Sequence, residues 1–93
     1  MTTHNDRNNA WLPEPLDECQ MRSIIGLLDT YEADPHGARV MLDQLYWDGA
    51  LSGHHRQAVR ILFLLPTADA DELLARACKD EQARRVFLSM RGQ

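Results

Sequence analysis

The chain has 93 residues, 44% of them hydrophobic, with 14 acidic and 10 basic side chains and a formal net charge of −4. A chain of this length forms a single small domain, and its hydrophobic content excludes a protein that is disordered throughout. The acidic excess also argues against nonspecific binding to nucleic acid, because phosphate backbones attract basic surfaces.

The first 15 residues are predicted to be a flexible tail before a helical domain over residues 16–93. The tail is polar apart from Trp11 and Leu12, which we expect to fold back on the domain as a hydrophobic clasp. A short partner-binding anchor is the alternative. The tail has no apolar secretory signal, and no apolar run in the chain approaches the roughly 20 residues that span a bilayer. We therefore expect a cytoplasmic protein without a membrane partner.

Two amphipathic helices are predicted next. Asp17 and Glu18 suit the first turn of the first helix, where negative charge is favourable. Asp34 is expected to cap the second helix, with Pro35 in its first position and Gly49 as its left-handed stop. The side chains expected to face the core are those of Leu16, Met21, Ile24, Ile25, Leu27, Leu28 and Tyr31, and then Ala38, Met41, Leu42, Leu45 and Tyr46.

A third helix is predicted from a Ser52 cap to Pro66, and it is apolar over most of its circumference. Only the stripe with Arg56 and Arg60 is plainly polar. The apolar residues form one stripe of Ala58, Ile61, Leu62 and Leu65 and a second of Val59 and Phe63, with Leu64 beside the arginines. Such a helix is either central to its domain or shared with a partner.

Two shorter helices are expected to complete the fold. Asp69 and Glu72 have the spacing of a capping box, and Asp80 is expected to cap a last helix or mark a kink. No segment alternates as a strand does. The expected inward residues are Leu73, Leu74, Ala77, Cys78, Ala83, Val86, Phe87 and Met90. The sequence predicts an all-α fold, a single small domain of four to five short helices in an orthogonal or helical-hairpin bundle.

Metal or catalytic chemistry is the first interpretation that His54 and His55 invite. Adjacent helical residues point about 100° apart, whereas a zinc-binding helix places its histidines four residues apart. We expect both histidines in a solvated first turn, and Cys19 and Cys78 as buried free thiols, because their spacing fits neither zinc nor a disulfide framework. No enzymatic activity, catalytic residue, metal or cofactor is expected.

DNA recognition is the alternative function. The segment from Met41 to Leu62 has the outline of a helix-turn-helix motif, which would present Arg56, Gln57 and Arg60 to base edges. The negative net charge counts against this reading, as does His55 at a position where such a helix needs an apolar docking residue.

Protein–protein interaction is the function that the pattern favours. We expect a chaperone, adaptor or regulator that buries an amphipathic helix of another protein, or a second copy of itself, against the third helix. The expected contact residues are Val59, Phe63, Leu64 and Trp47.

Two resemblances imply the same kind of function. The stretch "ELLARACKDEQARRVFLSMRGQ", with "GARVMLDQLYWDG" and "RQAVRILFLL" before it, is similar to small tetratricopeptide-like chaperones of type III secretion needle subunits. Those are cytoplasmic helical proteins that mask a partner's amphipathic helix. The stretch "LDQLYWDGALSGHHRQAV" resembles the second and third helices of caspase-recruitment-type death folds. Neither resemblance assigns a role to a particular residue.

Overall fold

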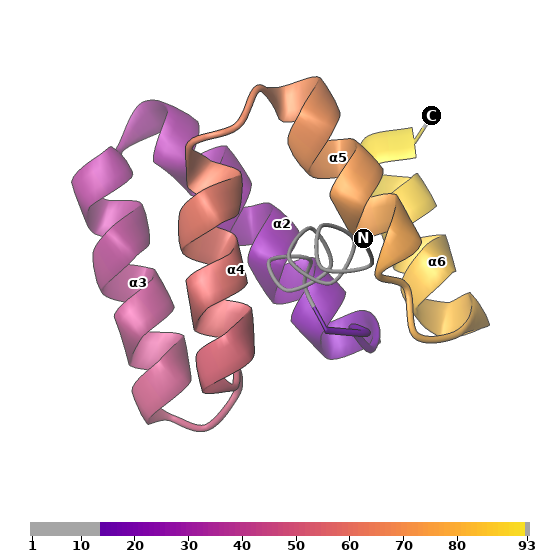
Figure 1. The fold of residues 1–93 in the computed structure, drawn as a ribbon, viewed down its shortest axis with the longest axis horizontal. Helices are drawn as coiled ribbons and strands as arrows, with labels where there is room; N and C mark the ends of the chain where they lie inside the picture. Colours follow the sequence, from indigo (N-terminus) through magenta and orange to yellow (C-terminus); the bar gives the residue numbers. More distant parts are fainter. Residues whose placement is uncertain (1–13, 93) are drawn as a thin grey trace, which may run out of the picture.

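The structure, a computed structural model, describes residues 14–92. In this range the chain forms five α-helices and no strand, so the predicted all-α class is confirmed (Figure 1). Residues 1–13, which include Trp11 and Leu12, lie outside the described residues, and the predicted tail and clasp stay predictions. The helices are α2 (Glu18–Ala33), α3 (Pro35–Trp47), α4 (Gly53–Phe63), α5 (Thr67–Arg76) and α6 (Glu81–Phe87), followed by a π-helical turn, η1 (Leu88–Gly92).

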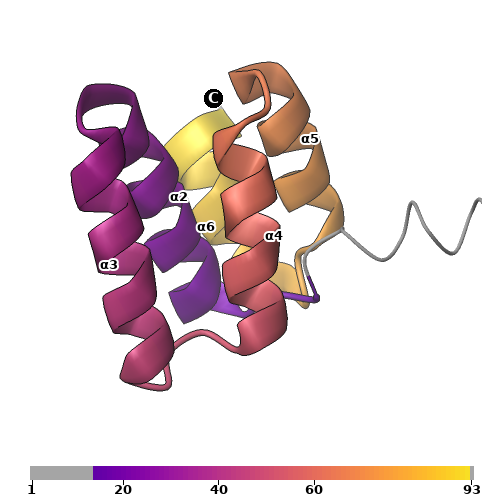
Figure 2. The same cartoon turned by 60° about the vertical axis from the view of Figure 1, so that its left-hand side comes forward.

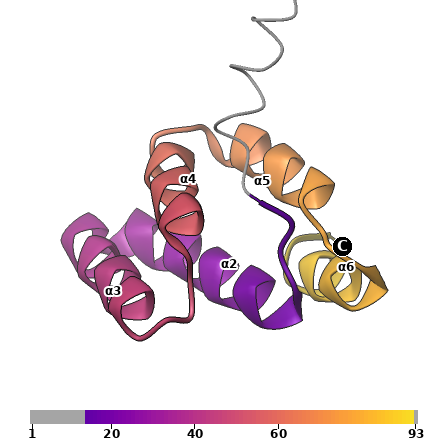
Figure 3. The same cartoon turned by 60° about the horizontal axis from the view of Figure 1, so that its bottom comes forward.

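Helix α2 is the centre of the domain and contacts α3, α4 and α6. Helices α3 and α4 form an antiparallel hairpin on one side of α2, and α5 and α6 lie toward its other end (Figures 1 and 3). Figure 2 shows α4 between α3 and α5. This position gives α4 neighbours on three sides, since α2 lies behind it.

The helix boundaries follow from caps within each segment. Asp17 and Gln20 form a capping box at the start of α2, with the Asp17 carboxylate 2.8 Å from the Gln20 backbone nitrogen. Asp34 caps α3 by accepting from the Gly37 N–H at 3.0 Å, as predicted. Gly49 follows α3 with a φ of 85°, a left-handed conformation that favours glycine, which confirms the predicted stop.

Helices α4 and α5 differ from the expected boundaries on either side of Pro66. Helix α4 ends at Phe63, two residues before Leu65, which precedes Pro66 and is therefore disfavoured in helical conformation. Helix α5 begins directly at Thr67, without a side-chain cap, so the expected capping box at Asp69 is wrong. The ring of Pro66 already holds its φ at −57°, and Asp69 instead lies in the first turn, where its charge suits the helix dipole.

One hydrophobic core joins all the helices, and Leu16, before α2, is fully buried in it. Three of the residues that were expected to be buried are exposed instead. Met41 and Met90 are 46% and 39% exposed, because α3 and η1 lie at the edges of the bundle. Cys19 is also exposed, because it precedes the buried Met21 by two residues and a helix turns by about 200° over that separation. Within residues 14–92, none of the helices has the length and apolarity that crossing a lipid bilayer requires.

Candidate interaction surfaces

The second apolar stripe of α4 lies inside the domain. Val59 is fully buried and Phe63 is 7% exposed. The Phe63 ring stacks on Tyr31 of α2, with centroids 4.3 Å apart and an interplanar angle of 11°. The prediction that Val59 and Phe63 face a partner is therefore wrong for the folded domain, because α2 and its neighbours already cover this stripe.

The other two predicted contact residues are at the surface but far from each other. Trp47 is 75% exposed and Leu64 is 74% exposed. Trp47 ends α3 beside the turn to α4, whereas Leu64 follows the far end of α4. Because α3 and α4 are antiparallel, the two side chains lie at opposite ends of the hairpin and do not form one surface.

Trp47 instead belongs to an apolar face on the outside of α3. We call Val40, Met41 and Trp47 the α3 outer face; Val40 is 52% exposed. Val40 and Trp47 are seven residues apart, about two helical turns, so they lie on one line that points away from the core residue Ala38. The sequence held a signal for this face, since Val40 is an apolar residue outside the stripe expected to face the core.

The predicted DNA-contacting arginines are engaged with α3. Arg56 Nη2 lies 3.0 Å from Asp43 Oδ1, and Arg60 Nη2 lies 3.7 Å from the same oxygen. The Arg56 guanidinium also lies over the Tyr46 ring, 4.5 Å from its centroid, while Gln57 is exposed. Helices α3 and α4 lie side by side in Figures 1 and 2, unlike the steeply crossed pair of a helix-turn-helix motif.

His55 is buried, contrary to the expected solvated position, and helps to cap α4. Its side chain is 6% exposed, and its Nδ1 accepts from the Ser52 backbone N–H at 3.3 Å. Its Nε2 lies 3.7 Å from Glu14 Oε1, while the exposed His54 lies 4.0 Å from the other Glu14 oxygen. A sequence signal was available, because His55 lies three, four and seven residues before the buried Ala58, Val59 and Leu62.

Metal binding finds no support in this region. No three His, Cys, Asp or Glu side chains from residues 14–92 lie where they could hold a metal ion together. Cys78 is partly buried, and this burial raises the pKa of its thiol. A raised pKa keeps the thiol protonated at neutral pH and lowers its reactivity.

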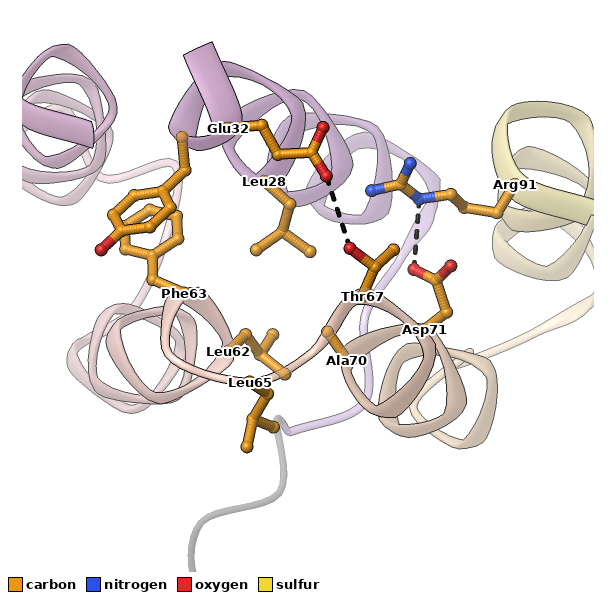
Figure 4. Close-up of a pocket in the computed structure, with 10 residues that line it drawn as sticks. Leu28, Glu32, Leu62, Phe63, Leu65, Thr67, Ala70, Asp71 and Arg91 are labelled. Carbon is orange, nitrogen blue, oxygen red and sulfur yellow. Dashed lines mark hydrogen bonds and ion pairs between the residues drawn. The ribbon is translucent and has the colours of Figure 1, made fainter. Parts of the chain in front are cut away.

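A small cavity lies between α2, α4, α5 and η1 (Figure 4). Its volume is about 50 Å³, which is room for a few water molecules and well below that of an ordinary ligand pocket. Arg91 closes one side, 2.9 Å from Asp29 and 3.2 Å from Asp71, and Thr67 donates to Glu32 at 3.4 Å. The polar groups around the cavity therefore join α2, α5 and η1.

A second hollow, of about 220 Å³, lies along α5 beside the end of α4. We call it the α4–α5 groove. It is lined by Leu65, Asp69, Glu72, Leu73 and Arg76, of which the two leucines are half-buried.

Comparison of the chain with protein-family models, with curated proteins and with solved structures finds no match. The functional argument therefore depends on the surfaces described above.

Proposed function

We propose that this protein is a protein–protein interaction module, a chaperone, adaptor or regulator, that binds through the α3 outer face. The observation that carries the proposal is Trp47, a large aromatic side chain left 75% exposed on the helix that also presents the exposed Val40 and Met41. Tryptophan is among the residues most enriched at the centres of protein interfaces. Several large apolar side chains exposed on one helix are typical of a binding site.

An amphipathic helix is the partner that this face fits best. Val40 and Trp47 are about 10 Å apart along α3, which is two turns of helix. A partner helix whose apolar residues repeat every three or four positions would place successive side chains against them. The expected partner is a helix of another protein, or α3 of a second copy.

DNA binding, the alternative function, has less support from the contacts between α3 and α4. Arg56 and Arg60 share Asp43 as an ion-pair partner, and contact with phosphate would have to compete with that carboxylate. The net charge of −4 opposes the approach of the whole domain to DNA.

A cross-linking experiment tests the proposal. A photoreactive phenylalanine analogue at Trp47 is expected to capture a partner in cells that express the protein, or a second copy in the purified protein. The same analogue at Leu64 is the matched control, since it is equally exposed at the other end of the hairpin. Trp47→Ala should weaken binding of the captured partner at least tenfold, about 1.4 kcal/mol. Equal capture at both positions, or unchanged affinity of Trp47→Ala, would refute the role of the α3 outer face.

A further inference from the structure

Arginine side chains border the α3 outer face on the side that meets α4. Asp43 lies three residues after Val40 and four before Trp47, so it neighbours both on the surface of α3. Arg56 and Arg60 of α4 both reach its Oδ1, at 3.0 and 3.7 Å. The two guanidinium groups are therefore held next to the line of apolar residues on α3.

This border carries more positive than negative charge. In the described part of the chain, Arg56 and Arg60 share Asp43 as their ion-pair partner, so one carboxylate faces two cations. Arg39 lies four residues before Asp43 on the same side of α3, is exposed, and donates to the neutral Tyr31 hydroxyl at 3.2 Å. We call Arg39, Arg56 and Arg60 the arginine border; together with Asp43, these side chains have a net charge of +2.

The opposite side of the α3 outer face has no such positive charge. Its bordering residues on α3 are Gln44, four residues after Val40, and Asp48, and the Gln44 amide donates to Asp48 Oδ1 at 3.4 Å. The two sides of the apolar face therefore differ in charge, positive toward α4 and negative away from it. With three arginines against two aspartates, residues 35–64 carry a charge of +1, whereas the whole chain carries −4.

We propose that the α3 outer face binds an acidic amphipathic helix of another protein, whose Asp or Glu side chains face the arginine border. The apolar side chains of such a helix cover Val40 and Trp47. Carboxylates at every third or fourth position along one side of the helix pair with Arg39 and Arg60. Arg60 is half-exposed and 3.7 Å from Asp43, and its five N–H donors allow it to bind a second carboxylate while it keeps the first. This inference rests on the function proposed above, since it names the partner of the same surface.

Charge favours this partner over a second copy or DNA. In a two-fold pairing of antiparallel α3 helices, the arginine border of one copy meets that of the other, and the like charges repel each other. A DNA duplex binds through several phosphates along its length, so it extends past the hairpin toward a domain with a net charge of −4. A single helix needs to contact only the hairpin, and charges more than about 8 Å away are largely screened at physiological ionic strength.

A peptide library panned on the full chain tests the proposal. The library displays helices of about 20 residues that share one apolar stripe and carry Glu, Gln or Lys on either side of it. Counter-selection with Trp47→Ala keeps the peptides that bind through the α3 outer face, and these should be enriched in Glu along one side of the stripe. Trp47-dependent peptides without this enrichment would overturn the acidic partner and still support the α3 outer face. A library that yields no Trp47-dependent peptide would overturn the proposed function, and this inference with it.

Charge reversal locates the contact on the protein. For a selected acidic peptide, labelled for fluorescence anisotropy, Arg60→Glu should raise the Kd roughly tenfold, and exchanging the peptide's Glu for Lys should restore binding to this variant. Arg85→Glu is the matched control, because Arg85 is exposed on α6, on the other side of α2 from α3, and should change the Kd by less than about twofold. Equal effects at positions 60 and 85 would overturn the assignment to the arginine border. Arg60→Gln supplies the same comparison if circular dichroism shows that Arg60→Glu does not fold.

Two further measurements identify the other occupants. We expect the purified protein to be a monomer in light scattering and to bind the acidic peptide more tightly than a labelled DNA duplex of about 20 base pairs. A dimer that Trp47→Ala converts to a monomer would assign the face to a second copy and overturn the proposal. A duplex that binds more tightly than the peptide and is released by Arg60→Glu would overturn it in favour of nucleic acid.

Discussion

Gly26 is an interior glycine of α2 for which the structure shows no steric need. A Cβ atom built on Gly26 meets nothing within 4 Å, and its φ lies outside the left-handed region. Glycine in a helix interior is less favourable than alanine by about 0.5–1 kcal/mol. Gly26→Ala should therefore raise the free energy of unfolding by that amount, measured by urea denaturation.

The control for this substitution is Gly49→Ala. Gly49 has a φ of 85°, so an added Cβ strains the backbone and should lower stability by about 1 kcal/mol. The interpretation of Gly26 would be wrong if both substitutions destabilised the domain.

Phe63 tests whether the second stripe of α4 belongs to the core. It is 7% exposed and stacks on Tyr31, so Phe63→Ala should cost about 3–5 kcal/mol of stability, visible in thermal or urea unfolding. The neighbouring Leu64→Ala removes an exposed side chain and should change stability by no more than about 0.5 kcal/mol. A Phe63→Ala protein of normal stability that loses partner binding would instead support the original prediction of a contact residue.

The ends of the helices were predicted well from the sequence where a residue close by in the chain caps them. Asp34, Ser52 and Asp80 cap their helices as expected, because each carboxylate or hydroxyl accepts from a backbone N–H three residues later. The start of α5 was missed because Pro66 sets the backbone without a side-chain bond. Only packing between helices decides that Met41 is exposed, and that packing is not visible in the periodicity of one segment.

At the level of elements, the ion pairs of Arg91 hold η1 against the rest of the domain. Its side chain is 18% exposed and lies between Asp29 of α2 and Asp71 of α5. Arg91→Ala should cost about 1–2 kcal/mol, between the values of exposed and buried ion pairs. Hydrogen exchange should become faster at the amides of residues 88–92.

Arg85→Ala is the matched control for the Arg91 substitution. Arg85 pairs with Glu81, and both side chains are about 70% exposed, so its loss should cost no more than about 0.5 kcal/mol. If the two variants had the same stability and the same exchange rates, the attachment of η1 through Arg91 would be refuted.

At the scale of the whole molecule, the candidate surface was predicted only in part from the sequence. The sequence identified Trp47 and Leu64 as exposed apolar side chains but joined them to Val59 and Phe63 in one surface. The sequence of α4 alone does not decide whether its second apolar stripe is buried or exposed. In the fold, α2, α3 and α5 surround the helix and cover this stripe. Helix α3 has fewer neighbours than α4, so the exposed apolar face lies on α3 instead.

Leu16 tests whether the domain unfolds as one unit. Its side chain is fully buried, and its backbone joins the segment before α2 to the connection between α5 and α6. Because α2 contacts both halves of the bundle, we expect Leu16→Ala to lower the stability of the whole domain by about 2–5 kcal/mol. Circular dichroism and intrinsic fluorescence should follow a single urea transition with an unchanged slope. Leu88→Ala, at a residue that is 49% exposed, should leave the midpoint nearly unchanged. Two separate transitions in the Leu16→Ala protein would show that the helices around α5 and α6 unfold independently of the α3–α4 hairpin, and that α2 does not couple them.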